Sequence, residues 1–300
     1  MVKLFWGIVK ASRPRQWIKN FAVFAALIFS GTLFDPTNQI KTLAAFLLFC
    51  IFSSATYLLN DVFDVERDKL HPFKQKRPIA SGLVPIPLAV SLALLSIAIF
   101  LPFAYKLSPA FFFATLTYLI IQLFYSAFLK RIILIDVLAI AAGFVLRVYG
   151  GVWAIDAHLN VWFLLCVTSF ALFLAIGKRR SERTLISSVT FPHRETLLHY
   201  PENLLDILTS MFANSTWLTY AFFAFLQPPI QARHLPIPEA KYLMATVPVV
   251  LYAVMRYLYI IYEKKEGESP ERVILRDKPL LITVIFWLIM VVGIIYYLGP

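Results

Sequence analysis

Long apolar runs separated by short polar segments are the dominant pattern along the 300 residues of this chain. A helix needs about 20 mostly apolar residues to cross the hydrocarbon core of a membrane. Nine runs are long enough, near residues 17–34, 40–60, 87–105, 109–128, 132–153, 160–177, 203–227, 239–261 and 279–298. The pattern therefore predicts an all-α polytopic membrane protein with about nine transmembrane helices in a bundle.

Three longer polar segments interrupt this pattern, at residues 61–86, 178–202 and 262–278. Two of them follow the second and the sixth apolar run, which gives the chain a coarse internal rhythm. We expect a single transmembrane domain over residues 1–300, with an internal repeat (1–130 and 131–265) followed by a ninth helix. The polar segments are expected to be loops at one face, over a cavity that opens to the cytoplasm.

The lysines and arginines predict the orientation of the chain in its membrane. If the amino terminus is cytoplasmic, 22 of the 28 fall in cytoplasmic segments. Four fall outside (Lys41, Lys106, Arg233 and Lys241), and the remaining two, Arg147 and Arg256, lie within predicted spans. Because cytoplasmic loops retain excess positive charge, we expect a cytoplasmic amino terminus and an outside carboxyl terminus in the cytoplasmic (inner) membrane.

The composition agrees with a membrane protein and argues against a nucleic-acid partner. Hydrophobic residues make up 60% of the chain and charged residues 15%, whereas soluble domains have roughly half and a quarter. The net charge is +11, but the basic residues alternate with apolar runs instead of covering a soluble face. The composition leaves open whether the protein forms a homo-oligomer.

A cluster of acids at the end of the second apolar run is the strongest chemical signal. On a helix, Asp61, Asp64 and Asp68 would share one face, because they are three and seven residues apart. Crowded carboxylates repel one another unless a cation holds them, and oxygen ligands that leave room for phosphate suit Mg²⁺. Lys74 and Arg77 follow closely and could bind a polyphosphate. The alternative interpretation is a solvated acidic helix end.

The same segment carries a family resemblance. The stretch Asn60-Asp61-x-x-Asp64-x-x-x-Asp68, followed by Arg-Pro-Ile-Ala-Ser-Gly from Arg77, resembles the UbiA-type superfamily of intramembrane prenyltransferases. The likeness extends over essentially the whole chain. Members that use prenyl diphosphates carry a second Asp-x-x-x-Asp motif after the sixth helix. This chain instead has Lys178-Arg179-Arg180-Ser181-Glu182-Arg183.

That basic segment points to one branch of the superfamily. Together with residues 13–20 and 125–130, it resembles the polyprenyl-phosphate (decaprenyl-phosphate) 5-phosphoribosyltransferases. The resemblance implies a pentosyl transfer from phosphoribosyl diphosphate to a membrane polyprenyl phosphate, with release of diphosphate. Because the acceptor phosphate is already negative, no deprotonating residue is expected. For the basic segment, the alternative is a positive-inside anchor.

The resemblance also implies the residues of the site. Asp61, Asp64 and Asp68 would be the catalytic residues and would hold Mg²⁺ on the leaving diphosphate. The residues assigned to substrate binding are Gln16, Lys19, Asn20, Asn60, Lys74, Arg77, Lys130, Lys178, Arg179 and Glu182. The roles of Arg147 and Asp136, both within predicted spans, stay open between function and structure.

Two other functions are compatible with parts of the pattern. An aromatic prenyltransferase of the same superfamily would use a polyprenyl diphosphate, as in quinone synthesis, but should show the second aspartate pair. A secondary transporter would place its ionisable residues near the membrane midplane, whereas here they gather at one face. Both alternatives therefore rank below the phosphoribosyl transferase.

Overall fold

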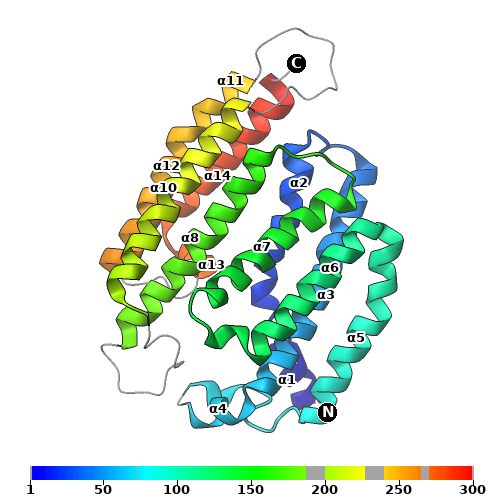
Figure 1. Ribbon diagram of the computed structural model, residues 1–300. Coiled ribbons are helices and arrows are strands. Elements are labelled where there is room, and N and C mark those ends of the chain that lie inside the picture. The colour runs from blue at the N-terminus through cyan, green and yellow to red at the C-terminus, as the bar shows by residue number, and fades with distance from the viewer. Residues whose placement is uncertain (1, 72, 187–199, 227–239, 265–269, 299–300) are drawn as a thin grey trace. The chain divides into compact units, whose positions relative to one another are not determined.

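The computed structural model describes residues 2–71, 73–186, 200–226, 240–264 and 270–298. All regular elements in these ranges are helices, so the expected all-α fold is confirmed for the described part of the chain (Figure 1). The chain divides into two compact units. The amino-terminal unit comprises Met1–Leu27 and Phe34–Ala157, and the carboxy-terminal unit comprises Ile28–Leu33 and His158–Pro300.

The helices of the amino-terminal unit, with η for 3-10 and π-helical segments, are α1 (Val2–Ala11), η1 (Pro14–Val23), α3 (Pro36–Phe63), α4 (Val65–Leu70), η2 (Lys74–Lys76), α5 (Ile86–Leu107), α6 (Pro109–Ala127), η3 (Leu129–Arg131) and α7 (Ile135–Ala154). Helix α2 (Phe24–Phe29) follows η1 and ends in the carboxy-terminal unit. The rest of that unit contains α8 (Val161–Ile186), α10 (Glu202–Leu226), α11 (Ala240–Leu243), η4 (Met244–Thr246), α12 (Val247–Tyr259), η5 (Ile260–Lys264), α13 (Pro270–Arg276), α14 (Lys278–Gly293) and η6 (Ile294–Leu298).

Seven helical stretches in the described ranges are long and apolar enough to cross a membrane. They are Pro36–Phe63, Ile86–Leu107, Pro109–Ala127, Ile135–Ala154, Val161–Thr184, Met244–Lys264 and Lys278–Tyr297. These seven agree with seven of the predicted runs, and the count of nine stays a prediction. Helix α10 is 25 residues long, but its polar residues keep it outside the seven.

The first predicted run, 17–34, differs most from the structure. It forms η1 and then α2, which ends at Phe29, instead of one long α-helix. The chain turns soon afterwards at Gly31, whose φ of 75° suits glycine because it has no Cβ. The apolar run therefore forms a 3-10 segment followed by six residues of α-helix.

Two of the spanning helices begin with a polar capping residue followed by proline, a pattern that is visible in the sequence. Asp35 accepts a hydrogen bond from the Thr37 amide at 2.9 Å and precedes Pro36, the first residue of α3. Ser108 has the same position before Pro109 and α6. A side-chain acceptor at the cap followed by proline suits a helix start, because the first amides have no partner within the helix.

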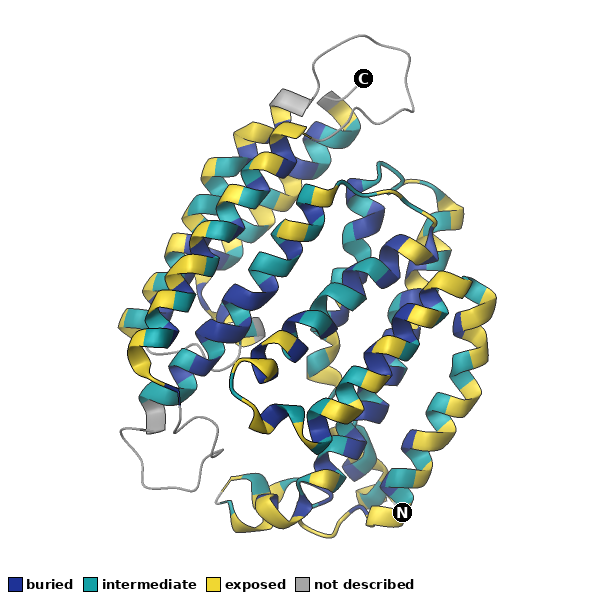
Figure 2. Ribbon diagram, in the orientation of Figure 1, coloured by how far each residue is buried: buried dark blue, intermediate teal, exposed yellow. Residues whose placement is uncertain are grey.

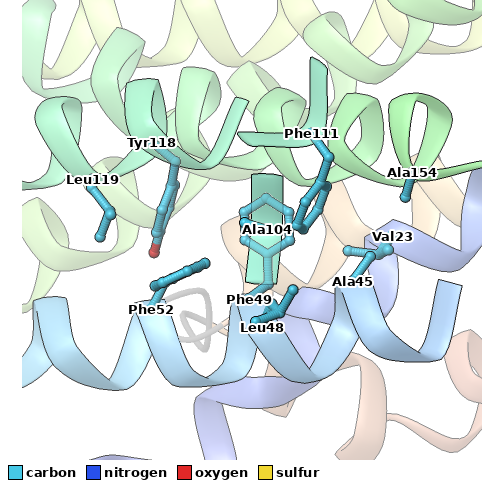
Figure 3. Packing of buried hydrophobic residues seen from close by; sticks show 10 residues of the cluster. All are labelled: Val23, Ala45, Leu48, Phe49, Phe52, Ala104, Phe111, Tyr118, Leu119 and Ala154. Atoms are coloured by element: carbon cyan, nitrogen blue, oxygen red, sulfur yellow. The ribbon is translucent and has the colours of Figure 1, made fainter. Parts of the chain in front are cut away.

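Helix α3 is the central helix of the amino-terminal unit. Its most apolar window is 61% buried, against 11% for α5, which exposes most of its surface (Figure 2). The core around α3 contains Phe49 and Phe52 of α3, Phe111 and Tyr118 of α6, and Ala104 of α5 (Figure 3). An exposed apolar helix is the expected arrangement where the solvent is lipid.

The packing of α7 against η1 depends on a glycine. A Cβ atom at Gly151 would collide with the carbonyl oxygen of Val23. Only glycine lets the two backbones approach this closely, as is common where helices pack in membranes. This contact fixes η1, which carries several of the predicted site residues, against α7.

In the carboxy-terminal unit, α8 lies along α10, and Phe173, Tyr257 and Ile261 form part of its core. Asp277 caps α14 by accepting a hydrogen bond from the Leu280 amide at 3.0 Å. Hydrogen bonds from Arg256 hold the pKa of Asp277 well below its usual value. Because the pKa of Asp277 is lower in the folded protein than in the unfolded chain, the ionised Asp277 carboxylate stabilises the folded state above about pH 4. This stabilisation is lost as the pH falls further.

Candidate active site

The three motif aspartates lie on α3, on α4 and in the break between these two helices. Helix α3 ends at Phe63 and α4 begins at Val65, so Asp64 occupies the break between them. The expectation of one continuous acidic helix is therefore wrong. The backbone of Asp64, with φ −97° and ψ 1°, leaves the helical region and turns the chain. Asp61 ends up on α3 and Asp68 on α4, both buried.

Two arginines hold the buried pair. Arg77 donates hydrogen bonds to Asp61 Oδ1 at 3.1 Å and to Asp68 Oδ2 at 2.6 Å. The guanidinium of Arg13 also donates to Asp61 Oδ1. A buried carboxylate needs such partners, because an unpaired charge away from water is strongly unfavourable. The turn at Asp64 therefore brings Asp61 and Asp68 within reach of the same guanidinium.

Arg13 has an unusual backbone. Its φ of 52° and ψ of 58° lie in the left-handed region, which is uncommon for a residue other than glycine. Its guanidinium lies 5.2 Å from the centre of the Tyr57 ring on α3. Strained backbone that the surroundings maintain is frequent at functional sites. Arg13 is thus a candidate for the site that was not among the residues predicted from the sequence.

Lys130 reaches the third aspartate from a distant part of the chain. It lies in η3 and is buried. Its Nζ atom is 2.6 Å from Asp64 Oδ1 across 66 residues of sequence. The structure therefore brings Lys130 to the aspartate motif, and its role toward a substrate stays a prediction.

The aspartates supply the hard oxygen ligands that Mg²⁺ prefers. Within the described ranges, no three histidine, cysteine, aspartate or glutamate side chains converge on one point that could hold a metal ion. Mg²⁺ at phosphate-handling sites commonly takes only one or two carboxylates, and substrate oxygens and water complete its coordination. Asp61, Asp64 and Asp68 each offer such a carboxylate, and their role as metal ligands stays a prediction.

Arg147 and Asn20 form a buried polar network next to η1. Arg147 of α7 donates to Asn20 Oδ1 at 2.7 Å and to the Tyr118 hydroxyl at 2.9 Å. Asn20 in turn donates to Ser53 Oγ of α3 at 3.2 Å. The side chain of Asn20 is fully buried. Both residues therefore join η1 to its neighbouring helices, which assigns a structural role to Arg147.

The other predicted residues of this unit are distributed over three elements. Gln16 and Lys19 lie on η1, Asn60 on the last turn of α3, and Lys74 at the start of η2; all four are half-buried. Asp136 is buried in the first turn of α7. These positions leave the substrate roles of the first four as predictions.

The basic segment of the carboxy-terminal unit is helical, not a loop. Residues 178–186 form the last turns of α8, so the predicted loop 178–202 begins later in the chain. Residues 187–199 and 265–269, which belong to two of the predicted loops, lie outside the described residues. Arg179 is 1% exposed and donates to Glu182 Oε2 at 2.5 Å. The side chain of Lys178 is 34% exposed, and its Nζ atom lies 3.7 Å from Glu182 Oε1. Of the two cations beside Glu182, Lys178 is therefore more accessible to solvent than Arg179.

Arg180 has a structural environment that its sequence position does not reveal. It donates to Asp206 Oδ1 of α10 at 2.9 Å and lies 3.8 Å from the centre of the Tyr262 ring. The Tyr262 hydroxyl donates to the same Asp206 oxygen at 3.0 Å. These contacts join α8, α10 and η5, so Arg180 stabilises this end of the carboxy-terminal unit.

The chain is similar to known proteins over nearly its whole length. Residues 20–276 match the model of the UbiA prenyltransferase family. The chain is 34% identical to the decaprenyl-phosphate phosphoribosyltransferase of Mycolicibacterium smegmatis, over 97% of this chain and 93% of that protein. The proteins of the same name from Corynebacterium glutamicum and Mycobacterium tuberculosis are each 32% identical; they cover 97% and 94% of this chain, and 87% and 92% of their own lengths.

Solved structures show the same fold. A UbiA homologue from Archaeoglobus fulgidus bound to GPP and Mg²⁺ superposes with a TM-score of 0.69 and 19% identity, over 96% of this chain and 99% of that chain. A structure of digeranylgeranylglyceryl phosphate synthase gives a TM-score of 0.67 at 17% identity, over 99% of both chains. Together with the spanning helices and the aspartate motif, these matches show that the chain is an integral membrane protein of the UbiA prenyltransferase family.

Proposed function

We propose that the protein transfers a 5-phosphoribosyl group from phosphoribosyl diphosphate to a membrane polyprenyl phosphate, such as decaprenyl phosphate, and releases diphosphate. The observation that carries this proposal is the end of α8, where four basic residues accompany the single acid Glu182. A prenyl-diphosphate user would be expected to carry a second aspartate pair there. The names of the most similar relatives support the same activity.

The reaction needs positioning more than proton transfer. An oxygen of the lipid phosphate forms the new bond to C1 of the ribose, and the bond from C1 to the diphosphate oxygen breaks. The electron pair of that bond leaves with the diphosphate. Because the acceptor oxygen is already negative at neutral pH, no side chain has to remove a proton. The side chains of the site act by orienting both phosphates and stabilising the leaving group.

We assign the leaving diphosphate to the end of α3. Asp61, Asp64 and Asp68 would hold Mg²⁺, which neutralises charge that develops on a leaving phosphate. Arg77 and Lys130 already lie within hydrogen-bond distance of these acids. When a diphosphate enters, both cations can turn from carboxylate oxygens to phosphate oxygens, which are similar acceptors. Arg13 can act in the same way from η1.

Further donor contacts are assigned to α8 and to η1. The exposure of Lys178 supports a direct contact with a donor phosphate. Arg179 is paired with Glu182, which supports a role in holding the end of α8 in place. Gln16, Lys19, Asn60 and Lys74 remain assigned to the substrate pocket on the resemblance described above, and Asn20 contributes by fixing η1.

The active cavity is proposed to open to the cytoplasm, beneath the basic segments. The asymmetric distribution of lysine and arginine supports a cytoplasmic amino terminus and an outside carboxyl terminus. The nine apolar runs support nine crossings of the cytoplasmic membrane. The donor is a charged cytosolic metabolite, so this orientation gives it direct access. A homo-oligomer is compatible with the site, because all the proposed residues belong to one chain.

An assay in sealed membrane vesicles tests both the activity and the orientation. Labelled phosphoribosyl diphosphate is added outside vesicles that contain the protein, polyprenyl phosphate and Mg²⁺. We expect labelled lipid in inside-out vesicles and none in right-side-out vesicles. Labelled lipid in right-side-out vesicles alone would overturn the orientation. Absence of labelled lipid in both, with consumption of a polyprenyl diphosphate instead, would overturn the function in favour of aromatic prenyl transfer.

The half-buried Lys178 gives a sharper test of the donor site. Replacing it (Lys178→Ala) removes a charge-assisted hydrogen bond, which should raise the donor KM roughly ten- to a hundredfold. The KM for the lipid should stay unchanged. The measurement is donor saturation in reconstituted membranes. Lys264→Ala is the matched control, because Lys264 is similarly exposed and pairs with Asp277 at 2.8 Å. An equal effect in both variants would favour the positive-inside anchor over a donor contact.

A further inference from the structure

Helix α1 has two different faces. One face packs into the amino-terminal unit, where Gly7 and Ala11 are buried. A Cβ atom at Gly7 would lie 3.0 Å from the Leu83 side chain and 3.1 Å from that of Val84, so the helix sits tightly on the segment before α5. Leu4 belongs to the same packed face. The helix is therefore a fixed part of the unit and not a loose terminal extension.

The opposite face carries aromatic and basic residues. Phe5 is 62% exposed and Trp6 is 64% exposed, and Val2 beside them is exposed as well. Lys3, Trp6 and Lys10 are three and four residues apart, so they form one stripe along the helix. Both lysines are exposed. The exposed face of α1 thus carries aromatic side chains, with Lys3 one turn before Trp6 and Lys10 one turn after it.

The position of α1 places this surface at the boundary of the membrane. Helices α1 and α4 lie at the same end of α3 (Figure 1). Leu83 and Val84, which pack on Gly7, immediately precede the spanning helix α5. A helix of ten residues is about 15 Å long, which is half the hydrocarbon thickness, so α1 cannot cross the membrane. It therefore lies at the level where two spanning helices end.

We propose that α1 is an interfacial helix that binds the anionic lipid headgroups of the adjacent leaflet. Phe5 and Trp6 insert at the boundary between headgroups and acyl chains, where amphipathic aromatic rings are favoured. Lys3 and Lys10 contact lipid phosphates on either side of Trp6. The proposal is independent of the reaction that the protein catalyses.

A lipid surface fits this face better than a second copy of the chain does. In a symmetric dimer, the same patch would meet itself, so Lys3 and Lys10 of one chain would face the same lysines of the other. Like charges placed opposite each other disfavour such a contact. An anionic headgroup layer complements the lysines and buries the rings in the same step.

The helix is also connected to the aspartate motif. Ser12 directly follows α1, and its carbonyl oxygen accepts a hydrogen bond from Ser54 Oγ of α3 at 3.1 Å. Arg13 comes next and is paired with Asp61. Lipid binding by α1 therefore acts on a rigid segment that ends in the candidate site.

Hydrogen exchange of the full-length protein in lipid nanodiscs tests the proposal. The discs hold one chain each and contain either phosphatidylcholine alone or phosphatidylcholine with phosphatidylglycerol. In the anionic discs, we expect exchange of the amides of residues 2–11 to slow by about fivefold for each lysine, or about twenty-five-fold in all. The double variant Lys3→Gln/Lys10→Gln should lose this difference between the two kinds of disc.

The variant Lys41→Gln/Lys106→Gln is the matched control, since it removes the same charge at the opposite ends of α3 and α5. It should keep the full effect of anionic lipid. Wild-type exchange that is equal in both discs would overturn the proposal, as would loss of the difference in the control variant. Protection that arises only in discs with two chains, whatever the lipid, would show that a second copy covers α1.

Discussion

Asp64→Asn is expected to lower turnover roughly a hundred- to a thousandfold, the range seen when one group that stabilises transition-state charge is removed. Asp64 lies in the break between α3 and α4, where its carboxylate would bind Mg²⁺ on the leaving diphosphate. The measurement is turnover at limiting and at saturating Mg²⁺. The control is Glu66→Gln, which makes the same charge change on α4 at a side chain that is 80% exposed. Near-normal turnover of Asp64→Asn at limiting Mg²⁺ would contradict the metal role.

A second variant separates a chemical loss from a structural one. Asp64 is the partner of the buried Lys130, so its neutralisation also leaves a buried ammonium without its anion. Asp64→Asn/Lys130→Met removes both charges and should restore thermal stability. The midpoint of thermal unfolding of the single and double variants is the readout, because Lys130 is itself assigned to the diphosphate and its loss lowers activity whatever Asp64 does. We expect the double variant to recover stability and to stay inactive.

Arg147→Met is expected to destabilise the protein by about 2–4 kcal/mol, because it leaves the buried acceptors of Arg147 without a donor. Arg147 donates to Asn20 Oδ1, to the Tyr118 hydroxyl and, at 2.6 Å, to the Gly143 carbonyl. Arg147→Lys should not restore stability, because a single ammonium cannot reproduce the planar fork of the guanidinium. The measurement is the midpoint of thermal unfolding in detergent.

Two controls accompany this prediction. Arg131→Met removes an exposed arginine from η3 and should change the midpoint little. Asn20→Ala/Arg147→Met should lose less stability than the sum of the two single losses, because both changes break the hydrogen bond between Arg147 and Asn20, while Asn20→Ala also removes the one to Ser53. Additive losses in that double variant would show that Arg147 and Asn20 act independently, contrary to the network described above.

The apolar pattern predicted most of the helices because lipid exposure demands long apolar runs. The runs near 87–105 and 109–128 correspond closely to α5 and α6. The same pattern could not distinguish α-helix from η1, because an apolar run predicts burial and not which backbone hydrogen bonds form. Nor could it reveal the break at Asp64, because no proline or glycine marks that turn.

The sequence allowed the residues of the site to be predicted, but not which side chains form ion pairs with one another. The spacing of Asp61, Asp64 and Asp68 indicated the cluster, but Lys130 pairs with Asp64 across 66 residues. Such long-range pairs leave no local trace in one sequence. Likewise, nothing in the basic run of α8 distinguishes Arg180, which binds Asp206, from Lys178, whose side chain is about one-third exposed. Burial and partners decide these roles, and both arise only on folding.

The pairing of residues 28–33 with the last helix has a consequence for how the chain is made. The Tyr296 hydroxyl donates to the Ile28 carbonyl at 2.8 Å and accepts from the Leu33 amide at 3.0 Å, across 268 and 263 residues. Ribosomes add about 5–20 residues each second, so roughly 13 to 50 seconds separate the synthesis of the two partners. This early segment therefore waits in the membrane until its partner emerges, and the carboxy-terminal unit closes only after nearly the whole chain has been translated.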